Sequence, residues 1–138
     1  MIVYVYIGLV ILFFIAVYFG WKYKPIRINR KYFFAAWKTL QKLLVDKKTW
    51  AKSILDADKL MDEALKKKHF KGKSMGERLV SAQRHITDND GVWFAHKLSN
   101  KLESNPRTRL TKTDTKDALT GFKKALQDLG ALPNDKRK

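Results

Sequence analysis

The three histidines of the chain, His69, His85 and His96, are its first candidates for acid–base catalysis or metal binding. Imidazole titrates near neutral pH and can ligate zinc through either ring nitrogen. No HExxH arrangement surrounds any of them, the acidic residues are scattered, and the chain has no cysteine. His69 follows three lysines where a helix is predicted to end, and positive charge there offsets the helix dipole. We therefore expect structural roles for all three histidines, and neither a metal site nor a cofactor.

Four acidic residues cluster in one predicted helix, and four lysines flank them at helical spacings: Asp56, Asp58, Asp62 and Glu63, with Lys52, Lys59, Lys66 and Lys67. Opposite charges three or four residues apart stabilise an exposed helix face. The pattern indicates a solvated face with ion pairs, and a pair of catalytic carboxylates is the alternative. No phosphate-binding glycine loop, nucleophile elbow or dinucleotide-binding fingerprint occurs elsewhere. The sequence thus predicts no catalytic residue and a protein that is not an enzyme.

Residues 2–20 form an uninterrupted apolar run, IVYVYIGLVILFFIAVYFG, and residues 1–21 contain no charged side chain. A helix of about 20 apolar residues can cross a bilayer. Amphipathic aromatic residues stand at both ends, as in the interfacial belts of membrane spans: Tyr4 and Tyr6 at one end, and Tyr18, Trp21 and Tyr23 at the other. The alternative, a cleavable signal peptide, needs a basic leading region and a small-residue cleavage site. No basic residue precedes the apolar run, and Phe19-Gly20-Trp21 is a poor cleavage context. We predict a transmembrane anchor.

Basic residues crowd the C-terminal flank of this anchor: Lys22, Lys24, Arg27, Arg30 and Lys31. The other flank holds only the N-terminus. Because basic flanks stay in the cytoplasm, the rest of the chain is predicted on the cytoplasmic side of the inner (plasma) membrane, with the N-terminus outside. The same five residues are predicted to contact anionic lipid headgroups.

Five further helices are predicted from apolar residues that recur every three or four positions. The first covers residues 30–45, the second ends near His69, and the third begins with a capping box at residues 74–77. The fourth follows a turn at residues 88–91, and the fifth runs from Thr111 to a stop at Gly130. Short links between them predict an all-α protein, in which a compact bundle of about five helices follows the anchor.

Composition divides the chain into four parts: a transmembrane anchor at residues 1–21, a basic juxtamembrane linker at 22–29, a helical bundle domain at 30–132 and a charged disordered tail at 133–138. Trp37, Trp50 and Trp93 fall at core-facing helical positions, so they are predicted in the core rather than as base-stacking platforms. The helix at residues 30–45 mixes aromatic and basic side chains, and this mixture permits either packing in the bundle or a place in the membrane interface.

The net charge of +16 belongs entirely to the part of the chain that follows Trp21. Such a charge attracts anionic partners by its field alone. Two partners remain open: nucleic acid bound through its phosphates, or anionic lipid. The basic residues beside the anchor favour lipid, whereas residues 66–73 and 107–112 suit either partner.

Four segments carry a family resemblance: residues 50–58 (WAKSILDAD), 72–79 (GKSMGERL), 95–100 (AHKLSN) and 126–132 (LQDLGAL). They are similar to a family of small bacterial proteins from candidate-phylum lineages with reduced genomes. Members of that family combine one membrane span with a helical cytoplasmic domain and have no assigned activity. The resemblance covers most of the chain after Trp37 and implies the same architecture here.

The segment that contains His96 and Asn100 is also similar to the motif of HEPN helical domains, many of which cleave RNA with an arginine and a histidine. Here Ser99 stands at the arginine position, and the region of the expected histidine reads LESN at residues 102–105. The motif is therefore degenerate, and a residual ribonuclease is the least favoured hypothesis. The sequence favours a membrane-anchored, non-enzymatic interaction or adaptor domain with a protein partner. The alternative is a basic RNA-binding domain related to HEPN domains.

Overall fold

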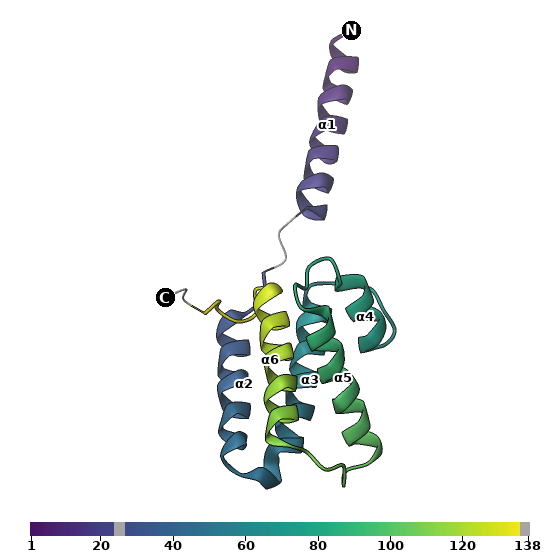
Figure 1. The fold of residues 1–138 in the computed structure, drawn as a ribbon. Helices are drawn as coiled ribbons and strands as arrows, with labels where there is room; N and C mark the ends of the chain where they lie inside the picture. The colour runs from purple at the N-terminus through teal and green to yellow at the C-terminus, as the bar shows by residue number, and fades with distance from the viewer. Residues whose placement is uncertain (24–26, 136–138) are drawn as a thin grey trace.

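The computed structural model describes residues 1–23 and 27–135 (Figure 1). Lys24, a predicted lipid contact, and residues 136–138 of the predicted tail lie outside the described residues. Six α-helices form the described part: α1 Ile2–Lys22, α2 Arg30–Lys42, α3 Trp50–Lys67, α4 Met75–Ala82, α5 Asn89–Ser104 and α6 Lys112–Asp128. Two 3-10 turns, Leu43–Val45 and Lys47–Thr49, join α2 to α3, and the described residues include no strand. The predicted all-α class, an apolar N-terminal helix followed by a helical bundle, is confirmed.

α1 extends from the bundle and has no buried residue (Figure 1). Within the described part of the chain, it is the one helix long and apolar enough to cross a membrane. Exposing such a surface to water costs about 25 cal/mol for each Å² of apolar area. By length and composition, α1 is therefore a candidate membrane span.

α3 is the central helix of the bundle, because α2, α4, α5 and α6 all pack against it. α5 and α6 form the most extensively packed pair. In Figure 1, α2, α3, α5 and α6 run along a common direction, and α4 lies at the end of the bundle nearest α1. All five helices contribute to one core, and its fully buried side chains include Phe33, Ile54, Met61, Leu79, Leu102 and Phe122.

α2 belongs to the bundle rather than to a membrane interface. Its apolar stripe, Phe33, Trp37 and Leu40, is buried, and the helix packs against α3. Trp37 thus lies in the core as its spacing predicts, whereas Trp50 and Trp93 are half-buried at the edge of the core.

Short polar side chains cap the starts of four helices: Asn29, Ser74, Asp88 and Thr111 each accept a hydrogen bond from a backbone N–H in the first turn. The predicted cap at Ser74 is present, since its Oγ accepts from the Glu77 N–H at 3.2 Å. The Glu77 carboxylate accepts from the Lys73 N–H at 2.5 Å, one residue before the position that a capping box uses. The predicted stop at Gly130 is also present, with φ of 76°.

α4 ends at Ala82, although Met75, Leu79, Ala82 and Ile86 recur at the spacing of one continuous helix. The Asn89 amide donates to the carbonyl oxygens of Gln83 and Ile86, each at 3.0 Å. A continuing helix would need the Gln83 carbonyl for its own ladder, so this side-chain bond favours a turn. Ile86 consequently reaches the core from a turn and not from the helix.

Candidate functional site

His96 lies on α5, with only 8% of its surface exposed. Its Nδ1 is 2.9 Å from Oδ1 of Asp58 on α3. Its Nε2 is 3.4 Å from Nδ2 of Asn100, one turn further along α5. The Trp93 ring meets the imidazole edge-on, with 6.0 Å between the ring centroids. We call Asp58, His96 and Asn100 the His96 cluster.

The hydrogen bonds of the His96 cluster favour one tautomer of a neutral imidazole. Because the Asp58 carboxylate accepts a hydrogen bond, Nδ1 carries the proton and Nε2 is left to accept from the Asn100 amide. A carboxylate that orients an imidazole in this way is also found beside general bases, where the free nitrogen faces the group to be deprotonated. In the His96 cluster, the free nitrogen is Nε2, and it faces the side-chain amide of Asn100.

A depression of about 670 Å³ adjoins the His96 cluster. Among its described lining residues, Ser74 supplies the only hydroxyl, and that oxygen already caps α4. Within the described part of the chain, no three His, Asp or Glu side chains gather so that they could hold a metal ion. The cluster thus holds an imidazole in place without a free hydroxyl among the described residues beside it, and its hydrogen bond joins α5 to α3.

Asp62, one turn from Asp58, fastens α4 to α3. The Arg78 Nε lies 2.7 Å from Oδ1 and its Nη2 lies 3.0 Å from Oδ2, which makes a bidentate ion pair. Nη1 of the same side chain donates to the Gly72 carbonyl at 2.8 Å. Partial burial raises the pKa of Asp62, but the hydrogen bonds and charges of Arg78 and Lys66 outweigh burial and lower that pKa overall.

The acidic group on α3 is therefore only in part the solvated face that its spacing predicts. Asp56 pairs with Lys52 of the same helix at 2.7 Å, as expected, and both side chains are open to solvent. Asp58 and Asp62 instead bind His96 and Arg78 on neighbouring helices. These two partnerships depend on how α4 and α5 pack, which helical spacing within α3 does not encode.

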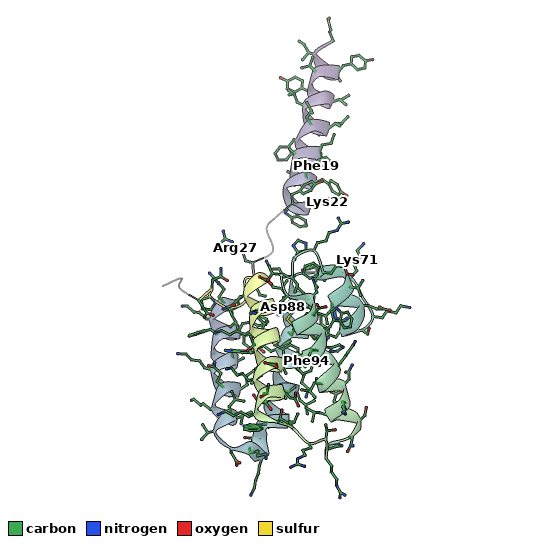
Figure 2. The ribbon with its side chains drawn as sticks, viewed as in Figure 1. Phe19, Lys22, Arg27, Lys71, Asp88 and Phe94 are labelled. Carbon is green, nitrogen blue, oxygen red and sulfur yellow. The ribbon has the colours of Figure 1, made fainter. Side chains whose placement is uncertain are left out.

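The predicted lipid-contact residues that the structure describes are all exposed: Lys22, Arg27, Arg30 and Lys31. They flank the short connection from α1 to α2, so they mark one end of the bundle. We call this the anchor-side end, and Figure 2 shows Arg27 there, next to the C-terminus of α1.

The anchor-side end also receives basic residues that are distant in sequence. Tyr32 Oη, in the first turn of α2, donates to Glu63 Oε2 on α3 at 2.8 Å, and this bond raises the pKa of Tyr32. Because α3 runs antiparallel to α2 and continues beyond Glu63, its C-terminal lysines and Lys71 lie at the anchor-side end. Figure 2 shows Lys71 at the same end as Arg27. Residues 66–73 thus lie at the end of the bundle nearest α1, although they are distant from α1 in the sequence.

Residues 107–112 lie at the opposite end of the bundle, which we call the distal end. Asp128 at the end of α6 accepts hydrogen bonds from the backbone and hydroxyl of Thr87, just before α5, both at 2.9 Å. The start of α5 and the end of α6 are therefore together, and the connection between these antiparallel helices is at the far end (Figure 1). The two basic segments, residues 66–73 and 107–112, thus lie at opposite ends of the bundle.

Comparisons of the chain with protein-family models, curated proteins and solved structures find no match. The two resemblances based on residues 50–58, 72–79, 95–100 and 126–132 remain predictions.

Proposed function

We propose that this chain is a single-pass protein of the inner (plasma) membrane, and that its helical bundle is a non-enzymatic interaction domain at the cytoplasmic face. The observation that carries the proposal is the contrast between α1 and the other helices. α1 has no buried residue, whereas each of the five helices that follow contributes to one core. An apolar helix that finds no cover in its own protein requires an apolar surrounding, and a bilayer supplies it.

The orientation is supported by the charges that flank α1. Residues 22–31 contain five basic side chains and no acidic one. Basic flanks stay on the cytoplasmic side. Exposed Lys66, Lys67 and Lys71 add positive charge at the anchor-side end, where each contributes about 1 kcal/mol of attraction to an anionic leaflet.

A non-enzymatic role is supported by polar side chains that bind one another between the helices of the bundle. His96 and Asp58 bind each other between α5 and α3. Ser99, at the position of the HEPN arginine, is fully buried and so is not available to a phosphate. Holding such a domain at a surface raises its effective concentration near other membrane proteins.

RNA binding is the second candidate, and the distal end is the observation that favours it. Arg107, Arg109 and Lys112 are exposed there, away from the lipid surface beside α1. Phosphate binding by these residues would weaken steeply with salt, because bound counterions are released. RNA affinity that is lost in an Arg107→Glu/Arg109→Glu variant would support this candidate over the adaptor.

Single cysteines test the proposed orientation, because the chain has no cysteine of its own. Val45 at the distal end is 92% exposed, and Ile2 in the first turn of α1 is 72% exposed. In intact cells, a membrane-impermeant maleimide is expected to label the Ile2→Cys variant and to spare Val45→Cys until the membrane is opened. Labelling of Val45→Cys in intact cells, or extraction of the protein by alkaline carbonate, would contradict the proposal.

A further inference from the structure

A groove runs between α2 and α6 on the side of the bundle away from α4. Both helices pack against α3 rather than closely against each other, which leaves a depression of about 320 Å³ between them. Its apolar lining is Trp37 and Leu44 from the α2 side, Trp50 from the start of α3, and Leu119 from α6. We call this depression the α2–α6 groove.

One of the two tryptophans that line the groove forms a hydrogen bond with the backbone, and the other forms none within the described part of the chain. The Trp50 Nε1–H donates to the Leu44 carbonyl at 2.9 Å, which fixes the indole at the distal end of the groove. Trp37 is 96% buried, since 4% of its surface is exposed, and its Nε1–H has no hydrogen-bond partner among the described residues. A buried donor without a partner costs about 1–3 kcal/mol, so an acceptor that reached it would be favourable.

Three lysines follow the α6 rim of the groove: Lys112, Lys116 and Lys123. Lys112 and Lys116 form no ion pair with any described carboxylate. Lys123 lies 3.1 Å from Asp135, and its hydrogen bond lowers the pKa of that carboxyl. The rim therefore binds a carboxylate at one of its three cationic positions and leaves the other two open.

We propose that the α2–α6 groove is the docking site for an acidic amphipathic helix of a partner protein. This inference rests on the proposed function, for which it names the class of partner. Apolar side chains of the docked helix would fill the space between the two tryptophans, and its carboxylates would pair with Lys112 and Lys116. Leu44, Trp50 and Lys112, which line the groove, lie at the distal end of the bundle, so a membrane beside α1 would leave that end of the groove accessible to a cytoplasmic protein.

The distribution of charge favours a peptide over a small amphiphile such as a fatty acid. From Lys112 to Lys123 the rim extends about 16 Å along α6, at 1.5 Å per residue. One carboxylate head can neutralise at most one of the two open lysines, Lys112 and Lys116, whereas a docked helix can bring an acidic residue to each of them. An elongated apolar groove with a cationic rim is the complement of a helix that has one apolar and one acidic face.

The test uses the full chain in phosphatidylcholine nanodiscs and fluorescein-labelled synthetic peptides of about 14 residues, read by fluorescence anisotropy. The first peptide has leucines at i, i+3, i+4 and i+7 with flanking glutamates, which is the helix-in-groove pattern. The second replaces each glutamate by lysine, and the third scrambles the first. The first peptide is expected to bind, and the other two to bind at least about tenfold more weakly, a difference of about 1.4 kcal/mol.

Two matched double variants locate the site. Lys112→Glu/Lys116→Glu reverses the rim and is expected to weaken binding of the first peptide about tenfold. Lys97→Glu/Lys101→Glu makes the same charge change at the same spacing on exposed positions of α5 and is expected to leave that binding unchanged. Circular dichroism of both variants confirms that the bundle is folded.

Three outcomes would overturn the proposal: no binding of the first peptide, equal affinity for the glutamate and lysine peptides, or equal affinity in the two double variants. Binding of laurate or of oligouridylate at the rim lysines, with no binding of the peptide, would also overturn it and assign the groove to another ligand. The peptide assay measures binding at the groove alone, whereas maleimide labelling measures on which side of the membrane each end of the chain lies. Failure of the docking inference is thus distinguishable from failure of the proposed function.

Discussion

At the scale of single residues, charged side chains on otherwise apolar helix faces position the helices of the bundle. Arg78 lies on the buried face of α4, between Met75 and Leu79, and His96 lies on the buried face of α5. A charged or titratable side chain within an apolar stripe signals a buried partner, because burial without one is costly. That signal identifies Arg78 and His96 from sequence, but only the packing of the helices identifies Asp62 and Asp58 as their partners.

The Asp62–Arg78 ion pair should make part of the stability depend on pH. Because the pKa of Asp62 is lowered in the folded protein below its ordinary value of 3.8, its stabilising contribution is present above that value and is lost as pH falls through the lowered pKa. Asp62→Asn should cost about 1–3 kcal/mol at neutral pH. The difference from the unaltered chain should shrink as pH falls below about 4, in urea unfolding followed by tryptophan fluorescence in detergent micelles.

The control for this prediction is Asp56→Asn, which removes the exposed pair with Lys52 on the same helix. Exposed pairs contribute only about 0.2–1 kcal/mol, so this variant should change stability little at any pH. Equal losses of stability in Asp56→Asn and Asp62→Asn would show that the Asp62–Arg78 pair stabilises the protein no more than an exposed ion pair does.

His69 is a second position where one residue should measurably lower the free energy of unfolding. It ends α3 with φ of 60°, its N–H donates to the Lys66 carbonyl, and the Phe70 N–H donates to the Leu65 carbonyl, which together form a Schellman motif. A residue with a side chain pays about 1–2 kcal/mol of conformational free energy in the left-handed region, and glycine avoids that cost. Glycine also raises the entropy of the unfolded chain, which cancels part of the gain in stability. His69→Gly should therefore stabilise the protein by about 0.5–1 kcal/mol in the same urea assay, and a loss of stability would contradict this reading.

At the scale of the elements, the α5–α6 pair depends on a close approach of two glycines. A Cβ on Gly121 of α6 would lie 2.3 Å from the carbonyl oxygen of Gly91 on α5, and backbone cannot easily yield that space. Gly121→Ala should separate the two helices and cost about 1–3 kcal/mol, measured by urea unfolding. Gly76→Ala in α4 is the matched control, since its Cβ would meet nothing closer than 3.7 Å. That control should be neutral or stabilising by up to about 1 kcal/mol.

Local signals in the sequence predict the helices well, and contacts between helices poorly. The caps at Ser74 and Thr111 and the stop at Gly130 involve residues a few positions apart, so the sequence shows both partners. The close approach of Gly91 and Gly121 joins residues thirty positions apart, and Gly91 reads in sequence only as part of a turn. The basic residues at the anchor-side end follow the same rule, because the antiparallel course of α2 and α3 brings them together.

At the scale of the whole molecule, the placement of residues 66–73 and 107–112 at opposite ends predicts how the bundle would lie on a membrane that holds α1. The connection from Tyr23 to Arg30 spans at most about 25 Å when fully extended, so a bilayer that held α1 would keep the bundle close to its surface. Under the proposed topology, the anchor-side end faces anionic headgroups, and the distal end with Val45 faces the cytoplasm. Electrostatic attraction should hold that orientation, and salt should relax it.

A fluorophore on a single cysteine can report this orientation in the full chain. Gln83 is exposed at the anchor-side end, two residues from His85, whose ring lies 5.3 Å from that of Phe70 just beyond α3. In vesicles with phosphatidylglycerol and headgroup-spin-labelled lipid, a probe on Gln83→Cys should be quenched, and a probe on Val45→Cys should not. Neutral vesicles or about 1 M salt, where the screening length falls to about 3 Å, should relieve the quenching.

The same probe distinguishes the two ends by their charges. Lys71→Glu/Lys73→Glu removes two lysines from the anchor-side end and adds repulsion, so the docked population should fall at least about tenfold at about 1 kcal/mol per basic residue. Arg107→Glu/Arg109→Glu makes the same change in net charge at the distal end and should leave the quenching intact. Equal effects of the two variants would mean that net charge alone, and not the placement of the lysines by α3, holds the bundle at the membrane. Because Leu44, Trp50 and Lys112 at the distal end line the α2–α6 groove, the docked orientation expected here leaves that groove in reach of a cytoplasmic helix.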